Sequence, residues 1–246
     1  MKPQRNDPAT FIERLFPVAP ELNRATPMSA QIYKLLRDGI VTMALQPNDQ
    51  IFERLIAEKL NMSRTPVREA LQLLARDELV VIAAQSGTYV APVRREQFVE
   101  SALIRRVLET ASIRRAAEVV SARALQELRD IHAAHRRAIE FQDAVAAIVY
   151  DNAFHAKVAA AAQLPKLLEL VELVRAPIDR VRHVTVRDPE VGAVTLNQHQ
   201  QILTALEQHD ADGAEQALQR HLDDAFARQQ LAFDAHQAMF EGRPEV

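Results

Sequence analysis

Beyond Pro92 the sequence has the pattern of helix almost to its end, and this pattern limits the fold more than any other feature. Five places interrupt it, near Ser121, Gln142, Gln163–Pro165, Asp188–Pro189 and Asp210–Gly213. The stretches between them, roughly 15 to 25 residues each, carry apolar stripes that helices bury against one another. Glycine occurs only 5 times in 246 residues, which also favours helix. The sequence therefore predicts a mainly α protein that ends in an all-helical bundle of about six helices.

Composition excludes several classes of protein. The chain has no cysteine, which excludes disulfides and thiolate metal sites and fits a reducing cytoplasm, the expected location. It has no uncharged apolar run of about 18 residues, so we expect no membrane partner. The net charge of −3 neither indicates nor excludes a nucleic-acid partner, because a local basic patch is enough for binding.

Residues 27–92 have a different pattern from the rest of the chain. Helices are predicted in "MSAQIYKLLRDGIVTMAL", with Ser29 as cap, in "FERLIAEKL" and in "SRTPVREAL". The stretch "LVVIAAQSGTYVAPV" then alternates two short β runs around a turn at Ser86–Gly87, which predicts a hairpin. Three helices followed by a hairpin predict an N-terminal winged helix-turn-helix. Residues 1–26 contain four prolines and are interpreted as an arm, which can include a short helical turn at "FIERLF".

The stretch "SRTPVREAL" places two cations beside each other. Arg64 and Arg68 are four residues apart, so they lie on one side of a helix and repel. Ser63 or Thr65 can cap this helix; with Thr65 as cap, Pro66 takes the first helical position. An apolar stripe lies behind the arginines, so they face outward.

Two interpretations of this arginine pair are open. In a helix-turn-helix the second helix enters the DNA major groove, where arginine can bind guanine in a forked pair or clamp a phosphate. Arg54, at the start of the preceding helix, and Gly87, at the hairpin tip, can then contact the DNA backbone that flanks the groove. The alternative is an ordinary surface helix whose arginines pair with Glu69 or Asp77.

The residues that carry a family resemblance are "IYKLLRDGIVTMALQPNDQIFERLIAEKLNMSRTPVREALQLLARDELV" and the "GTYV" that follows. This segment resembles the DNA-binding domain of the GntR family of bacterial transcription regulators. Asn48 and Asn61 stand where that family usually has glycine, and asparagine is the next best residue for a positive φ. The resemblance implies contacts to double-stranded DNA from Arg54, Arg64, Thr65, Arg68 and, in the wing, Gly87.

Four polar residues of the helical part fall on stripes that should be buried. Asp151 and His155 are four apart in "DNAFH", and His199 and His221 are each centred among apolar residues. A buried carboxylate is costly unless it is paired, and a divalent cation would pair it with the imidazoles. Nitrogen and oxygen ligands without sulfur suit Zn²⁺, Ni²⁺ or Mn²⁺.

The alternative for each of these histidines is a hydrogen-bonded core imidazole. His132 and His135 also lie on an apolar stripe, so the pattern by itself does not select the metal ligands.

Residues 97 to 235 carry a second resemblance, in "RRVLETASIRRAA", "DNAFHAKVAAAA" and "HQQILTALEQHDADGAEQALQRHL". They resemble the FCD effector domain of the FadR-like GntR subfamily. For the metal-containing branch, the resemblance implies ligands at Asp151, His155, His199 and His221, and none at His132 or His135.

Arg105 is the main candidate for binding an effector. The resemblance places an arginine at this position in the effector cavity, where a guanidinium beside a cation would suit a small carboxylate. The alternative is an ion pair within the helix to Glu109, four residues later. Arg175 and Arg182 are weaker candidates of the same kind.

The expected organisation is an arm (1–26), a winged helix-turn-helix (27–92), a linker (93–97), an FCD-type effector-binding and dimerisation domain (98–238) and a tail (239–246). Residues 27–92 hold seven basic and seven acidic residues, so one monomer should bind DNA modestly. A homodimer on a palindromic operator is therefore expected.

The predicted function is a transcription regulator, most simply a repressor and not an enzyme. A small organic acid is expected to change the angle between bundle and winged helix, which mis-spaces the recognition helices. One alternative is a metal-dependent hydrolase fused to a DNA-binding domain. For it, the sequence offers no HExxH and only Glu169 or Glu172 as general base. Another is an acyl-CoA-responsive regulator, although a metal would crowd a long hydrophobic tunnel.

Overall fold

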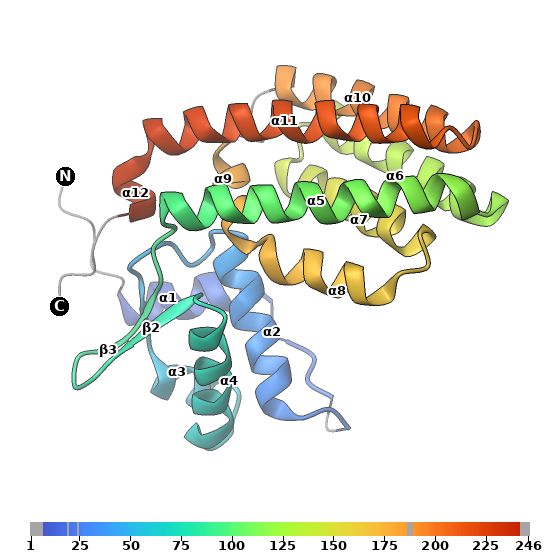
Figure 1. The fold of residues 1–246 in the computed structure, drawn as a ribbon. Coiled ribbons are helices and arrows are strands. Elements are labelled where there is room, and N and C mark those ends of the chain that lie inside the picture. The colour runs from blue at the N-terminus through green and yellow to red at the C-terminus, as the bar shows by residue number, and fades with distance from the viewer. Residues whose placement is uncertain (1–6, 19, 24, 186–188, 242–246) are drawn as a thin grey trace. The chain divides into compact units, whose positions relative to one another are not determined.

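The computed structural model of the protein describes residues 7–18, 20–23, 25–185 and 189–241 (Figure 1). The chain divides into two compact units. The first consists of Met1–Arg95 and His236–Val246, and the second is Glu96–Ala235. Among the described residues, no helix has both the length and the apolar character needed to cross a membrane.

The first unit is a winged helix-turn-helix, as predicted. Its helices are α1 (Pro8–Leu15), α2 (Met28–Val41), α3 (Glu53–Lys59), α4 (Arg64–Arg76) and α12 (Gln237–Glu241). Its strands are β1 (Gln50–Ile51), β2 (Val80–Ala83) and β3 (Gly87–Val90), which form an antiparallel sheet in the order β1-β3-β2. The predicted hairpin is β2–β3, in which Ala83 pairs with Gly87. The two-residue β1, where Gln50 pairs with Tyr89, was not predicted.

Two turns of this unit depend on asparagine in a left-handed conformation. Asn48 has φ 69° and Asn61 has φ 50°, which agrees with the expectation that these residues replace glycine. Helix α4 begins at Arg64 with Ser63 as its N-cap, so Thr65 and Pro66 lie inside the first turn. The predicted cap Ser29 is wrong, because α2 begins at Met28 and Pro27 precedes it.

The helical turn expected at "FIERLF" is part of a longer helix, α1, which spans residues 8–15 of the expected arm. The Asp7 side chain accepts a hydrogen bond from Thr10 N at 3.3 Å and so caps the helix. Phe11 is fully buried, with its ring 5.5 Å from that of Phe52, and Arg14 pairs with Asp49 at 2.9 Å. This segment is therefore a packed part of the first unit.

The expected linker and tail also contain helix. Helix α5 (Arg95–Val119) begins inside the predicted linker, and α12 begins before the predicted tail. Val93 N donates to Phe240 O at 2.9 Å, and Arg95 N donates to Glu241 Oε1 at 3.1 Å. The remaining residues of the predicted tail, 242–246, lie outside the described part of the chain.

The second unit is an all-helical bundle. Besides α5 it contains α6 (Ala122–Glu140), α7 (Ala144–Ala161), α8 (Pro165–Val174), α9 (Ala176–Thr185), α10 (Pro189–Glu207) and α11 (Ala211–Ala235). Helix α6 packs against α7 and α10, and α11 packs against α10 and α9 (Figure 1). The apolar core includes Ile113, Leu128, Phe154, Ile202 and Leu218.

The described part of the bundle has seven helices where about six were expected. The additional break separates α8 from α9 at Arg175. Pro177 explains it, since proline has no N–H for the helical ladder and its ring disfavours helix in the preceding turn. Pro177 was the signal in the sequence that could have revealed this break.

Candidate metal centre and nucleic-acid interface

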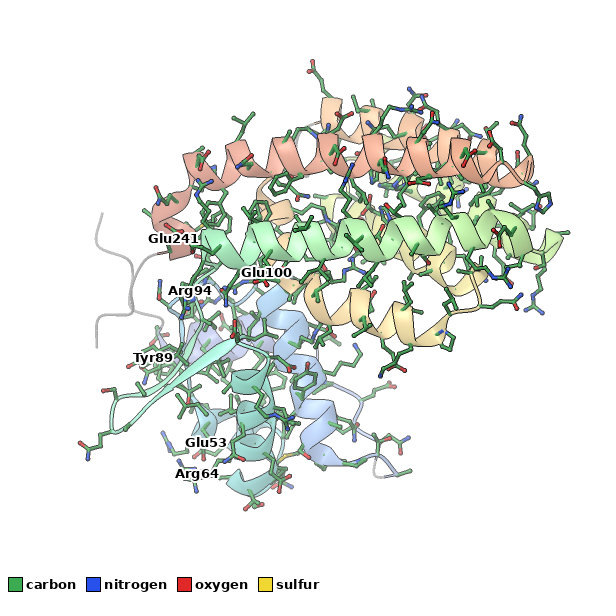
Figure 2. All side chains as sticks on the ribbon, viewed as in Figure 1. Glu53, Arg64, Tyr89, Arg94, Glu100 and Glu241 are labelled. Carbon is green, nitrogen blue, oxygen red and sulfur yellow. The ribbon has the colours of Figure 1, made fainter. Side chains whose placement is uncertain are left out.

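The exposed end of α4 shows how two neighbouring arginines are tolerated. The Nε atoms of Arg64 and Arg68 each lie 2.7 Å from Oε1 of Glu53, at the start of α3. Figure 2 labels Glu53 and Arg64. One carboxylate therefore offsets the repulsion of both guanidinium groups. Thr65 is exposed beside them.

The predicted alternative partners, Glu69 and Asp77, do not take this role. Asp77 accepts a hydrogen bond from Tyr33 Oη at 2.5 Å. Burial, and then this bond, raise the pKa of Tyr33 to about 12. Glu53, which the sequence did not reveal as a partner, joins the two helices of the helix-turn-helix instead.

The other predicted DNA contacts are also accessible. Arg54 is exposed on α3, where it pairs with Glu58 at 2.9 Å. Gly87 starts β3 with φ 129°, a conformation that residues with a side chain rarely adopt. An exposed ion pair such as Arg54–Glu58 contributes little, so Arg54 can exchange its carboxylate partner for a phosphate at small cost.

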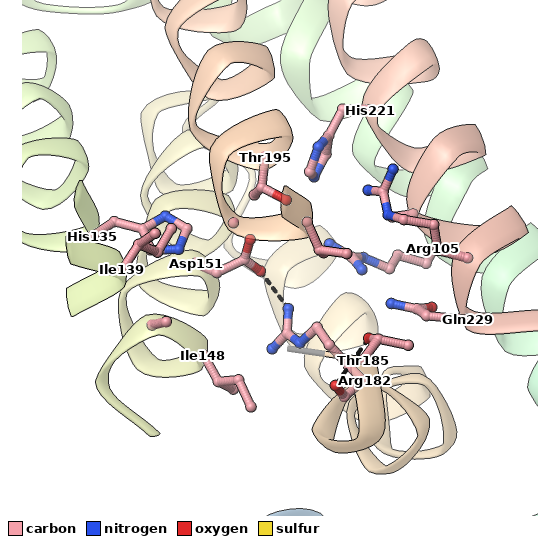
Figure 3. A pocket seen from close by; sticks show the side chains of 15 residues that line it. Arg105, His135, Ile139, Ile148, Asp151, Arg182, Thr185, Thr195, His221 and Gln229 are labelled. Atoms are coloured by element: carbon pink, nitrogen blue, oxygen red, sulfur yellow. Dashed lines mark hydrogen bonds and ion pairs between the residues drawn. The ribbon is translucent and has the colours of Figure 1, made fainter. Parts of the chain in front are cut away.

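In the second unit the structure brings together the four predicted metal ligands. Asp151 and His155 come from α7, His199 from α10 and His221 from α11, and all four are buried. Each offers one ligand atom, and these four atoms lie within 4.8 Å of one another. Figure 3 shows Asp151 and His221 at the wall of a cavity.

The groups beside two of these imidazoles indicate where their protons lie. His155 Nδ1 is 2.8 Å from Oε2 of Glu109, an ion-pair distance without hydrogen-bond geometry, and a carboxylate this close favours a proton on Nδ1 over a lone pair. Gln198 donates from Nε2 to Asp224 at 2.6 Å, so its Oε1 accepts from His221 Nδ1 at 3.0 Å. Both Nδ1 atoms therefore carry the proton, and each Nε2 of a neutral ring presents a lone pair.

Those two lone pairs face each other. His155 Nε2 and His221 Nε2 are 3.2 Å apart, an unfavourable contact unless a cation lies beside both. Two ligands at about 2.1 Å from one ion are separated by roughly 3.0 to 3.4 Å, for angles between octahedral and tetrahedral. The fully buried His199 has no hydrogen-bond partner at either ring nitrogen, and its Nε2 is 3.6 Å from Asp151 Oδ1. The residues therefore fit a divalent cation.

The electrostatics keep His199, His221 and Asp151 in the protonation states that metals need. Burial lowers the pKa of His221 to about 3 and holds that of His199 well below its usual value. Burial opposes ionisation of Asp151, but the Arg182 guanidinium outweighs it, so the pKa of Asp151 is well below the usual range. Neutral imidazoles and an ionised carboxylate bind a metal without first losing protons.

The two histidines outside the predicted ligand set have different surroundings. His132 Nε2 lies 3.0 Å from Leu196 O, as expected of a core imidazole. His135 lines the cavity, with its ring centroid 5.5 Å from that of His199, and burial lowers its pKa.

The cavity has a volume of about 60 Å³, and two of the three predicted effector-binding arginines line it. Arg105 is buried and pairs with Glu109 at 2.5 Å. Arg182 pairs with Asp151, with Asn152 and, at 3.2 Å, with Asp179. The lining also includes His135, Thr195, His221 and Gln229 (Figure 3).

Arg175, the third predicted arginine, is not part of this lining. It pairs with Asp179 at 2.8 Å and with Glu172 at 2.7 Å, so a shared carboxylate connects it to Arg182. The shared Asp179 therefore helps to hold Arg182 in place. Glu172, the residue suggested as a general base, forms an ion pair with Arg175.

Comparisons with known proteins agree with both halves of this description. Residues 28–90 match the model of the bacterial regulatory proteins of the gntR family, and residues 100–224 match the FCD domain. The chain therefore belongs to the gntR family of bacterial transcription regulators and carries an FCD domain.

Individual relatives support the same assignment. The chain is 31% identical over 207 residues to the HTH-type transcriptional repressor RspR of Escherichia coli, covering 84% of this chain and 91% of the relative. A GntR regulator from Rhodococcus sp. RHA1 is similar in structure, with TM-score 0.72 and 25% identity over 84% of this chain and 99% of its own. The fold of Escherichia coli McbR/YncC is also similar, with TM-score 0.77 and 24% identity, covering 85% of this chain and 99% of McbR. The family consists of regulators and not enzymes, so a fused hydrolase has no support.

Proposed function

We propose that this regulator is a homodimeric repressor that acts in the cytoplasm on a palindromic operator. A small carboxylate, bound beside a divalent metal in the helical unit, would control its affinity for the operator. The observation that carries the proposal is the buried set of Asp151 and three imidazoles at the wall of a cavity that two arginines share. The helix-turn-helix would read DNA, and ligand and operator would weaken each other by the same factor.

A small ligand is favoured over an acyl-CoA by the size and charge of the cavity. About 60 Å³ accommodates a few water molecules or a compact anion, whereas a long acyl chain needs an extended apolar channel. Arg105 and Arg182 would bind carboxylate oxygens in forked pairs, and an open position on the metal would take another oxygen. Zn²⁺, Ni²⁺ and Mn²⁺ all suit this donor set.

Ligand binding can be tested by thermal shift with a panel of small carboxylates, including citrate and lactate, on metal-loaded protein. A ligand that binds should raise the melting temperature, because it stabilises the folded state by roughly 2.7 kcal/mol at 100 times its Kd. Arg105→Met should abolish this rise. Arg106→Met is the matched control on the same helix, since Arg106 is half-exposed and pairs with Asp223. If no carboxylate shifts the wild type, or if both variants respond equally, Arg105 is not the effector contact.

DNA binding can be tested with an operator selected from a random duplex library by the full-length protein. Arg68→Ala should weaken operator binding by about 1–3 kcal/mol at fixed salt, because it removes a forked contact or a phosphate clamp. Arg76→Ala, an exposed arginine in the last turn of the same helix, should have little effect. A loss below a few tenths of a kcal/mol for Arg68→Ala would remove it from the interface.

A further inference from the structure

Glu109 occupies a position between the cavity and the proposed metal ligands. It is buried on α5, and its two carboxylate oxygens contact different partners. Oε1 lies 2.5 Å from Nε of Arg105, and Oε2 lies 2.8 Å from Nδ1 of His155. Arg105 lines the cavity, whereas His155 belongs to the metal group.

We propose that Glu109 is a positioning residue that selects the tautomer of His155 and so presents its Nε2 lone pair to the metal. This inference rests on the proposed metal site. The carboxylate does not touch the ion; it acts through the imidazole, which it orients and makes more basic. Because its other oxygen is bonded to Arg105, the same group connects the metal ligand to the effector cavity.

The charge of Glu109 is essential to this role. Arg105 can only donate, so whichever atom faces it must be an acceptor. A carboxylate satisfies Arg105 and still presents an acceptor oxygen to Nδ1 of His155. A glutamine has one acceptor, and if that oxygen faces Arg105, its NH₂ group faces His155. His155 Nδ1 must then accept, which moves the ring proton to Nε2, the proposed ligand atom.

The contacts of Glu109 are consistent with an ionised carboxylate at this buried position. A donor-only guanidinium lies 2.5 Å from Oε1 and an imidazole nitrogen lies 2.8 Å from Oε2. Glu109 can therefore act as an acceptor at both oxygens. His221 has an analogous arrangement, in which Gln198 and Asp224 fix its Nδ1 proton.

The first test measures the tautomer directly in metal-free protein at pH 7.5. Two-bond ¹H–¹⁵N correlations, assigned by comparison with His155→Ala, show which nitrogen of His155 is protonated. We expect Nδ1–H in the wild type and Nε2–H in Glu109→Gln. Nε2–H in the wild type would overturn the inference without any variant, so the test does not depend on Glu109→Gln being folded.

The second test measures affinity for Co²⁺ by competition with a chromophoric chelator. We expect Glu109→Gln to weaken binding about 10- to 100-fold with unchanged stoichiometry, the usual cost of losing such a partner. Glu118→Gln is the matched control, since Glu118 lies on the same helix, is exposed and pairs with Arg115. A Glu109→Gln affinity within threefold of the wild type overturns the inference if His155→Ala has lost the metal. If the wild type itself binds no Co²⁺, the proposed metal site fails instead, and this inference fails with it.

Discussion

Replacing His199 and His221 together by alanine should leave the protein without its metal. Two of four ligands are then missing, and Asp151 with His155 alone cannot hold a divalent ion tightly. In the wild type, Zn²⁺ at 1,000 times its Kd should stabilise the helical unit by roughly 4 kcal/mol, which corresponds to about 10 °C in melting temperature. In the double variant this increase should disappear. Elemental analysis and paired melts with and without a chelator measure both effects.

His132→Ala provides the control for this experiment. His132 is buried in the same bundle and loses a bond to Leu196 O when replaced, so the variant should melt at a lower temperature. It should nevertheless retain the metal and the Zn²⁺-dependent increase, because His132 is outside the proposed ligand set. An unchanged metal content in the double variant would refute the ligand assignment.

The elements of the fold that were predicted are those encoded by local patterns. Periodicity predicted α4 and the bundle helices except for the break between α8 and α9, and the requirement for positive φ explained Asn48 and Asn61. The two-residue β1 exists because its partner β3 lies alongside, which no local pattern of Gln50–Ile51 reveals. Helix α1 was not predicted at its full length because the four prolines of residues 1–26 favour an arm. So short a helix is stable only because Phe11 is buried.

Local sequence patterns predicted part of the candidate site, and the rest depends on contacts between residues distant in the sequence. Apolar stripes marked Asp151, His155, His199 and His221, but an apolar stripe also marked His132 and His135. The pattern does not separate the two groups, whereas the family resemblance and the fold do. The partners that fix the imidazole protons are distant in sequence. Glu109 was recognised as a helical neighbour of Arg105, and its contact with His155, 46 positions away, depends on how α5 meets α7.

Metal-free protein should become less stable as the pH falls from about 6.5. In the unfolded chain a histidine has a pKa near 6.5, whereas burial lowers the pKa of folded His221 to about 3 and that of His199 well below normal. Below pH 6.5 the unfolded state therefore binds protons that the folded state does not, so stability decreases with decreasing pH. Between pH 7 and 5 the two imidazoles together should cost roughly 3 to 4 kcal/mol.

The carboxylates of the site act in a separate, more acidic window. Asp151 and Glu109 have pKa values lowered by their cationic neighbours, so their contribution is nearly complete above about pH 5 and is lost below it. Denaturant unfolding of metal-free protein, measured with a chelator at pH 7, 6 and 5, therefore reports on the histidines and not on these carboxylates. The His199→Ala/His221→Ala variant should show a much shallower dependence over this range, because it lacks both groups. Equal slopes for the variant and the wild type would mean that these imidazoles are not held neutral in the folded protein, and the state assigned to the metal ligands would then be wrong.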